Sequence, residues 1–204
     1  MIAAVIWLKR MKPNEFAARW GDDLKSVEFA GDPNFPPEVV KFYTAAGHPT
    51  FFAINDYREL YFDTRCEHLP TVWNRIVGGP TPGFLDQYWK IGDVFFEQAE
   101  AWICIDHNTG RIVDVDPQVD DDEMVRSINS SPLIFFRGML LWKERFGNSR
   151  KPRKFDVNLH AAISDFAETK LFDDQDGRAF WFPNDFLCLD IADLKGYELI
   201  VSAS

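Results

Sequence analysis

The pattern of hydrophobic and polar positions divides this chain of 204 residues into a strand-rich middle and helical segments on either side. Residues 51–62 are rich in aromatic and β-branched side chains, with a polar break at Asn55 and Asp56, which predicts two short strands or one bent strand. Residues 88–96 predict another strand. Residues 101–105 are apolar throughout, as expected for a central strand of a sheet that is covered on both faces.

A polar turn follows this apolar strand directly. The segment from Asp106 to Gly110 contains side chains that hydrogen-bond their own backbone and a glycine that tolerates positive φ. The pattern therefore predicts that residues 101–105 and 111–115 pair as a β-hairpin.

Two short helices are predicted before the strands. Asn14 is placed to cap a helix over 15–20 that ends at Gly21. A second helix is predicted to run to Ala46 from the pair Pro36-Pro37, which pre-sets its first turn. The residues predicted to face inward from this second helix are Val39, Val40 and Tyr43.

Further helices are predicted after the strands. Ser131 suits an N-cap, Pro132 suits the first helical position, and apolar residues recur at helical spacing as far as Phe146. A basic linker over 148–154 then precedes a predicted helix over about 155–170, and a last strand is predicted over 197–201.

This order of elements predicts one α+β domain with a mainly antiparallel central β-sheet flanked by helices. We expect the domain to cover residues 11–204 and interpret residues 1–10 as an extension before it. The apolar run Ile2–Leu8 is too short to span a bilayer, and its positive charges follow it instead of preceding it as in a signal peptide. The sequence therefore favours a cytoplasmic protein without a membrane partner.

The net charge of the chain indicates which classes of partner it can bind. The chain has 22 Lys and Arg against 32 Asp and Glu, a formal net charge of −10, which opposes direct binding to nucleic acid or anionic membranes. A basic protein partner would be attracted. An acidic surface that only keeps the protein in solution is the alternative interpretation.

The most concentrated acidic run follows the predicted hairpin. It does not match a calcium-binding loop, because counting from Asp114 puts Val119 where a glycine is needed and Val125 where a bidentate glutamate belongs. Two interpretations remain: a solvated loop, or a patch that contacts a partner. The candidate partner-binding residues are Asp114, Asp116, Asp120, Asp121, Asp122 and Glu123.

Sequence patterns for metal, cofactor or catalytic sites are absent. The cysteines Cys66, Cys104 and Cys188 are far apart in the sequence, which indicates reduced and mostly buried thiols. A structural zinc site usually needs two spaced pairs of Cys or His ligands, and no such arrangement is present around the histidines. The chain contains no GxxxxGK[ST], GxGxxG or GxSxG motif. We therefore expect no metal, no cofactor and no catalytic residue.

Several segments together resemble the fourth family of the SUKH superfamily of bacterial immunity proteins. These segments are FYTAAGHPTFF at 42–52, YWKIGD at 88–93, WICIDHNTGRIVDVD at 102–116 and INSSPLIFF at 128–136. The resemblance covers about residues 37–146. Two features depart from the family pattern: Pro132 stands where that family more often has leucine, and residues 95–101 are longer than a tight hairpin requires.

The resemblance implies a SUKH-like α+β domain that binds and neutralises a cognate toxin of a polymorphic or contact-dependent system. No catalytic residue comes with it. Such toxins are often basic nucleases or nucleotide-modifying domains, to which an acidic inhibitor is complementary. Two alternatives stay open: a non-catalytic regulatory or scaffold module, as in some fungal SUKH-like proteins, and an enzyme whose groups meet only in space. The oligomeric state is also open.

Overall fold

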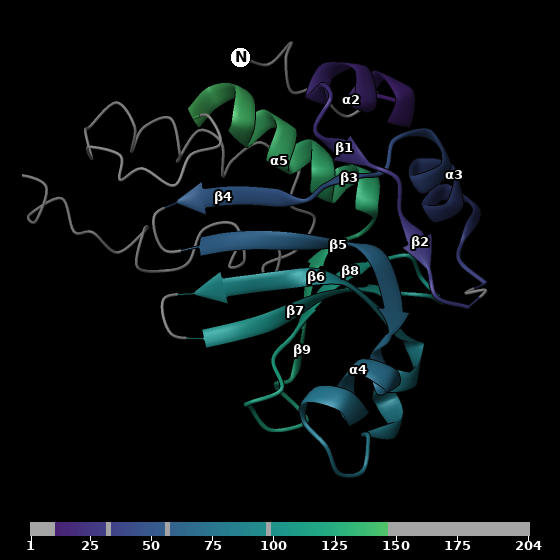
Figure 1. Ribbon diagram of the computed structural model, residues 1–204, viewed down its shortest axis with the longest axis vertical. Coiled ribbons are helices and arrows are strands. Elements are labelled where there is room, and N and C mark those ends of the chain that lie inside the picture. The colour runs from purple at the N-terminus through teal and green to yellow at the C-terminus, as the bar shows by residue number, and fades with distance from the viewer. Residues whose placement is uncertain (1–10, 32–33, 56–57, 97–98, 147–204) are drawn as a thin grey trace, which may run out of the picture.

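The described part of the chain begins and ends with a helix, and most of its strands lie between them, interrupted by α3 and by α4 with η1 (Figure 1). The computed structural model describes residues 11–31, 34–55, 58–96 and 99–146. The elements in chain order are α2 (Pro13–Trp20), β1 (Leu24–Lys25), β2 (Glu28–Phe29), α3 (Pro37–Ala45), β3 (His48–Pro49), β4 (Phe51–Asn55), β5 (Arg58–His68), α4 (Leu69–Ile76), the 3-10 helix η1 (Gly83–Gln87), β6 (Tyr88–Phe96), β7 (Ala99–Asp106), β8 (Ile112–Val115), β9 (Val125–Asn129) and α5 (Pro132–Phe146).

One main sheet organises the described part of the chain. Its seven strands run in the order β2-β5-β6-β7-β8-β9, with β4 also paired to β5. Every pairing in this sheet is antiparallel except that of β2 with β5, and β1 and β3 form a separate two-stranded sheet. The predicted α+β domain with a mainly antiparallel sheet is confirmed.

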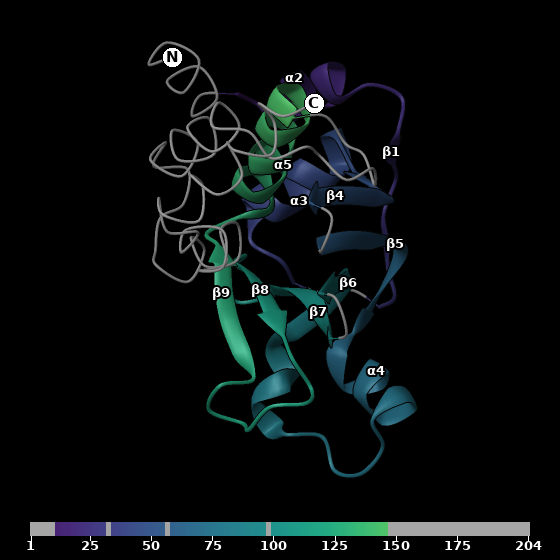
Figure 2. The same ribbon diagram turned by 90° about the vertical axis from the view of Figure 1, so that its left-hand side faces the viewer.

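Helices α2, α3 and α5 pack on one side of this sheet, which we call the first face (Figures 1 and 2). Their aromatic side chains meet in one cluster. The rings of Phe42 on α3 and Phe136 on α5 are stacked 5.3 Å apart, and Phe16 on α2 contacts both. Aromatic rings bury large apolar areas, so this cluster ties the three helices to one another as well as to the sheet.

Helix α4 and η1 cover part of the opposite side, the second face. Trp73 of α4 packs edge-on against Trp102 of β7, with 6.1 Å between the ring centroids. Strand β7 thus contributes to both cores: Ile103 and Ile105 belong to the first, and Trp102 and Cys104 to the second. This arrangement confirms that residues 101–105 form a central strand with two covered faces.

The predicted hairpin turn is also confirmed. The Asp106 carboxylate accepts hydrogen bonds from the backbone N–H groups of Asn108 and Thr109 and from the Thr109 hydroxyl. Gly110 has φ of +74°, and a Cβ at this position would lie 2.8 Å from Cγ2 of Val39. The turn therefore needs glycine both for its backbone conformation and for close contact with α3.

The predicted N-cap is confirmed for α5 and is wrong for α2. Ser131 caps α5 through its Oγ, which accepts from the N–H of Ile134 at 3.3 Å. Helix α2 begins at Pro13, so the prediction that Asn14 is its N-cap is wrong. Glu15 accepts from the backbone N–H of Lys12 at 2.8 Å, and this contact caps the helix at Lys12, two residues before Asn14.

In α3 the inward-facing residues are Val39 and Phe42, with Tyr43 partly buried, while Val40 is exposed. The expectation that Val40 faces inward is wrong, because the buried stripe of the helix continues through Phe42.

Neither α4 nor β9 was predicted from the sequence. The apolar residues of α4, Leu69, Val72 and Trp73, have helical spacing, but the segment is short and follows β5 directly. Strand β9 follows the acidic run directly, and no element was predicted for its residues. The predicted extension 1–10, linker 148–154, helix 155–170 and strand 197–201 lie outside the described residues. Within those that are described, no helix has the length and apolar character needed to cross a membrane.

Candidate functional site

The structure separates the six acidic candidates into two groups. Asp114 lies inside β8, is only 3% exposed, and faces Arg126 across the β8–β9 pair. Its Oδ2 accepts from Nη2 of Arg126 at 2.5 Å and from Nε at 3.1 Å. The half-buried Asp116 accepts from the backbone N–H of Gln118 at 3.0 Å. Asp114 therefore pairs within the sheet, and Asp116 shapes the turn that follows it.

The other four, Asp120, Asp121, Asp122 and Glu123, form a continuous exposed run in the β8–β9 connection, here called the acidic loop. The N–H of Asp116 donates to the carbonyl of Met124 at 2.9 Å and closes the base of the connection. Met124 is buried in the core of the second face, and Val119 packs against that core. Apolar anchors on both sides therefore hold the acidic loop in place while its carboxylates stay in solvent.

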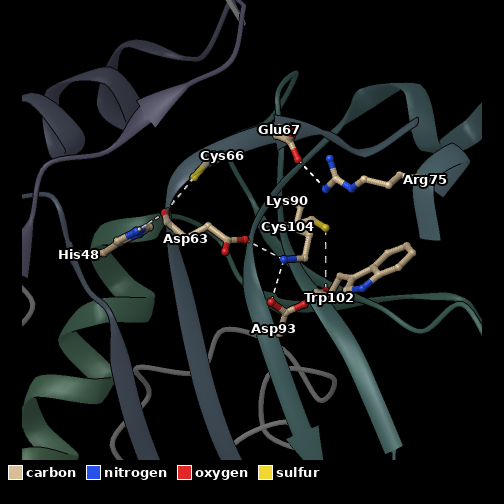
Figure 3. Close-up of polar contacts among 9 residues, drawn as sticks. All are labelled: His48, Asp63, Cys66, Glu67, Arg75, Lys90, Asp93, Trp102 and Cys104. Atoms are coloured by element: carbon tan, nitrogen blue, oxygen red, sulfur yellow. Dashed lines mark hydrogen bonds and ion pairs between the residues drawn. The ribbon is translucent and has the colours of Figure 1, made fainter. Parts of the chain in front are cut away.

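A second concentration of charge lies on the second face and was not predicted (Figure 3). Nζ of Lys90 donates to Oδ2 of Asp63 at 2.7 Å and to Oδ2 of Asp93 at 2.8 Å. Burial opposes the charge on Lys90, which is 7% exposed, but attraction to Asp93 and hydrogen bonds to both carboxylates outweigh it and raise the pKa of Lys90. Burial also raises the pKa of Asp93, and Lys90 offsets only part of this shift.

A β-bulge brings Lys90 and Asp93 together. In a regular strand, residues three apart point to opposite faces. Here Lys90 pairs with Cys104 and Asp93 with Trp102, so three steps on β6 match two on β7 and both charged side chains reach the same face. A Cβ at Gly92 would lie 2.2 Å from the Tyr61 carbonyl oxygen, so only glycine fits there. A glycine in a strand between two charged residues was the available signal.

His48 and Cys66 hold the neighbouring bend of β5 (Figure 3). Nε2 of His48 donates to the carbonyl oxygen of Asp63 at 2.9 Å, and Sγ of Cys66 donates to the same oxygen at 3.4 Å. The pairing register of β5 with β6 shifts between Phe62 and Glu67, where this carbonyl lies. Burial lowers the pKa of His48 to about 4, so the imidazole is neutral at pH 7.

The thiols agree with the prediction as far as the structure describes them. Cys66 and Cys104 are free and buried, and burial raises the pKa of both. Cys188 lies outside the described residues. A buried thiol with a raised pKa is a poor nucleophile, because the thiolate is the reactive form.

The Lys90 cluster has the chemistry of a structural ion triad. A lysine held as a cation by two carboxylates is neither a base nor a nucleophile, and the fully buried His48 cannot reach solvent. In the described ranges, no group of three or more His, Cys, Asp or Glu side chains is arranged to hold a metal ion. The acidic loop is therefore the candidate site that a partner can reach.

Comparisons with known proteins leave the family open. The resemblance to SUKH immunity proteins stays a prediction that rests on the sequence motifs. No protein-family model matches the chain, and no curated protein or solved structure is significantly similar to it.

Proposed function

We propose that this chain is an immunity protein that binds and neutralises a cognate protein toxin of a polymorphic or contact-dependent system, acting in the cytoplasm. The observation that carries the proposal is the acidic loop, whose four consecutive exposed carboxylates are held on an anchored connection. Inhibition by binding needs no catalytic group, metal or cofactor in the inhibitor.

Electrostatics favour a basic toxin domain as the partner. A net charge of −10 and a fixed acidic protrusion create a negative potential that speeds encounter with a basic surface, such as the nucleic-acid-binding face of a nuclease or of a nucleotide-modifying enzyme. The same charge repels nucleic acid itself. The toxin, and not its substrate, is therefore the expected ligand.

The motifs that resemble SUKH proteins fall on positions that shape the scaffold. Gly92 permits the bulge of β6, the segment from Asp106 to Gly110 forms the hairpin turn, and Ser131 caps α5. These roles suit a protein that works by presenting a rigid surface.

Co-expression tests the proposal. Each toxin domain encoded beside the gene for this chain would be induced in bacteria with and without the chain, and survival would be measured. Catalytically inactive versions of the same toxins would be used to test direct binding by co-purification. We expect one toxin to be both bound and neutralised. If none is, and pull-downs instead return cellular proteins, the immunity proposal fails and a regulatory or scaffold module takes its place.

A further inference from the structure

Exposed apolar side chains lie at the end of α4 and on η1. Among the described residues, five large apolar side chains are exposed, and three of them fall close together in the chain. These are Ile76 (58% exposed), Val77 (43%) and Phe84 (38%), which we call the α4–η1 patch. The other two, Val40 and Phe95, lie on α3 and β6.

Folding does not require apolar side chains at these positions. Helix α4 uses Leu69, Val72 and Trp73 to cover the second face, and η1 uses Leu85. Ile76 and Val77 come at the end of the helix, after its buried stripe, and face solvent. Grouped exposed apolar residues with no role in the core are typical of a surface that binds another molecule.

The elements that carry the α4–η1 patch and the acidic loop pack on the same buried cluster. Val72 and Trp73 of α4 and Leu85 of η1 belong to the same buried cluster as Met124, next to the acidic loop. Figures 1 and 2 show the β8–β9 connection and the α4–η1 segment at the same end of the molecule, away from α2, α3 and α5. The two features are thus held at one end of the domain.

The charges at this end have mostly one sign. Asp86 on η1 is exposed, as are the four residues of the acidic loop. Two cations near this end are already paired: Arg75 of α4, with its Nη2 2.6 Å from Oε2 of Glu67, and Arg126 of β9, with Asp114. The apolar residues therefore lie in an end surface with an excess of negative charge.

We propose that this end is the docking surface for the toxin and that it fits a basic protein face with an apolar centre. The inference rests on the proposed function and extends it from one loop to a defined surface. The carboxylates of the acidic loop steer association and set its dependence on salt. Ile76, Val77 and Phe84 lose water on docking and set the lifetime of the complex.

The first experiment removes the apolar centre without changing charge. It uses the full chain and the toxin that wild type neutralises in the co-expression assay, in its inactive form for binding. The variant Ile76→Gln/Val77→Gln/Phe84→Gln is compared with the matched control Val40→Gln, which changes an exposed apolar residue on α3. We expect the off-rate to rise about ten- to a hundredfold in the triple variant, with the on-rate little changed, and both rates to stay at wild-type values in the control.

The second experiment reverses the charge. Asp120→Lys/Asp121→Lys/Asp122→Lys is expected to reduce the on-rate at low salt about tenfold or more and to flatten its salt dependence. The off-rate should change less.

The outcomes separate the two proposals. Wild-type binding with unchanged rates in both variants overturns the docking surface and leaves the immunity function standing. Failure of wild type to bind any toxin overturns both. Thermal unfolding confirms that each variant is folded, and if the triple variant is not, Ile76→Gln alone, at the most exposed position, decides the apolar part by the same off-rate.

Discussion

The two faces of the sheet are buried in different ways. On the first face, helices α2, α3 and α5 cover the strands with a continuous aromatic and aliphatic core. On the second face, α4 and η1 cover an apolar area around Trp102, while Lys90 is buried between Asp63 and Asp93. The same strands serve both faces, so the difference comes from which side chains the bulge at Ile91 directs to each side.

The two faces should therefore respond differently to substitution. An apolar core loses stability in proportion to the area and volume removed, and it tolerates no charge. A buried ion triad contributes little net stability when complete, but removing one member leaves the others without compensation. The two faces can therefore be distinguished by mutation.

The largest effect is expected when a charge enters the part of either face that is apolar. Ile105→Asp on the first face and Trp102→Asp on the second each place an unpaired carboxylate in a buried strand. We expect a loss of more than about 4 kcal/mol, enough to prevent folding. Val40→Asp, at an exposed position of α3, should change stability by less than about 0.5 kcal/mol. Circular dichroism and chemical denaturation measure both, and a folded Trp102→Asp would show that the second face is not a true core.

A smaller loss is expected when the ion triad is broken. Lys90→Met leaves Asp63 and Asp93 without their cation and should cost about 2–4 kcal/mol, somewhat reduced because Asp63 is 42% exposed. The exposed pair Arg75–Glu67 is the control, and Arg75→Met should cost less than about 1 kcal/mol.

The double variant Lys90→Met/Asp93→Leu sharpens this test. If the triad is structural, replacing the buried pair with apolar side chains recovers most of the stability lost in Lys90→Met. Urea denaturation of wild type, Lys90→Met, Asp93→Leu and the double variant gives the coupling energy, and simple additivity of the two substitutions would contradict the interaction.

The first face carries a pH dependence through His48. Its pKa is about 4 in the folded protein and about 6.5 when unfolded, so the unfolded state binds more protons between these values. The contribution of the neutral His48 imidazole to the free energy of unfolding is complete at pH values above the pKa of the unfolded state. It is lost as the pH falls towards and through the pKa of the folded state. Between pH 8 and pH 5 this loss amounts to about 2 kcal/mol.

His48→Gln isolates that contribution, because an amide can still donate to the Asp63 carbonyl without titrating. The stability of this variant should fall less steeply than that of wild type over the same range, as measured by urea denaturation at each pH. Parallel curves would exclude His48 as the source.

The smallest effects concern the acidic residues. Asp114→Ala should cost about 1–2 kcal/mol, since it leaves Arg126 without its buried partner, although Arg126 is itself half exposed. Asp121→Ala in the acidic loop should change stability by less than about 0.5 kcal/mol. Thermal unfolding distinguishes the two, and equal losses would mean that the acidic loop is a structural element and not a free surface.

Local sequence patterns predicted much of the fold because they depend on neighbours in the chain. The continuous apolar strand 101–105, the turn from Asp106 to Gly110 and the Ser131 cap each rely on residues a few positions apart. The α+β class follows from the order of such segments. The same patterns identified the acidic run but treated its six residues as equivalent.

Contacts between distant segments decided what the sequence could not. Asp114 differs from Asp121 because it is buried in β8, where β9 places Arg126 opposite it, and Lys90 meets Asp63 across 27 positions of sequence. The exposed end surface likewise depends on one buried cluster, which holds residues of α4 and η1 together with Met124, next to the acidic loop. Local patterns were therefore enough to predict the fold class, the central strand and the acidic run, but not which charges are paired and buried. Pairing and burial depend on strand register and packing, which bring together residues that no local pattern connects.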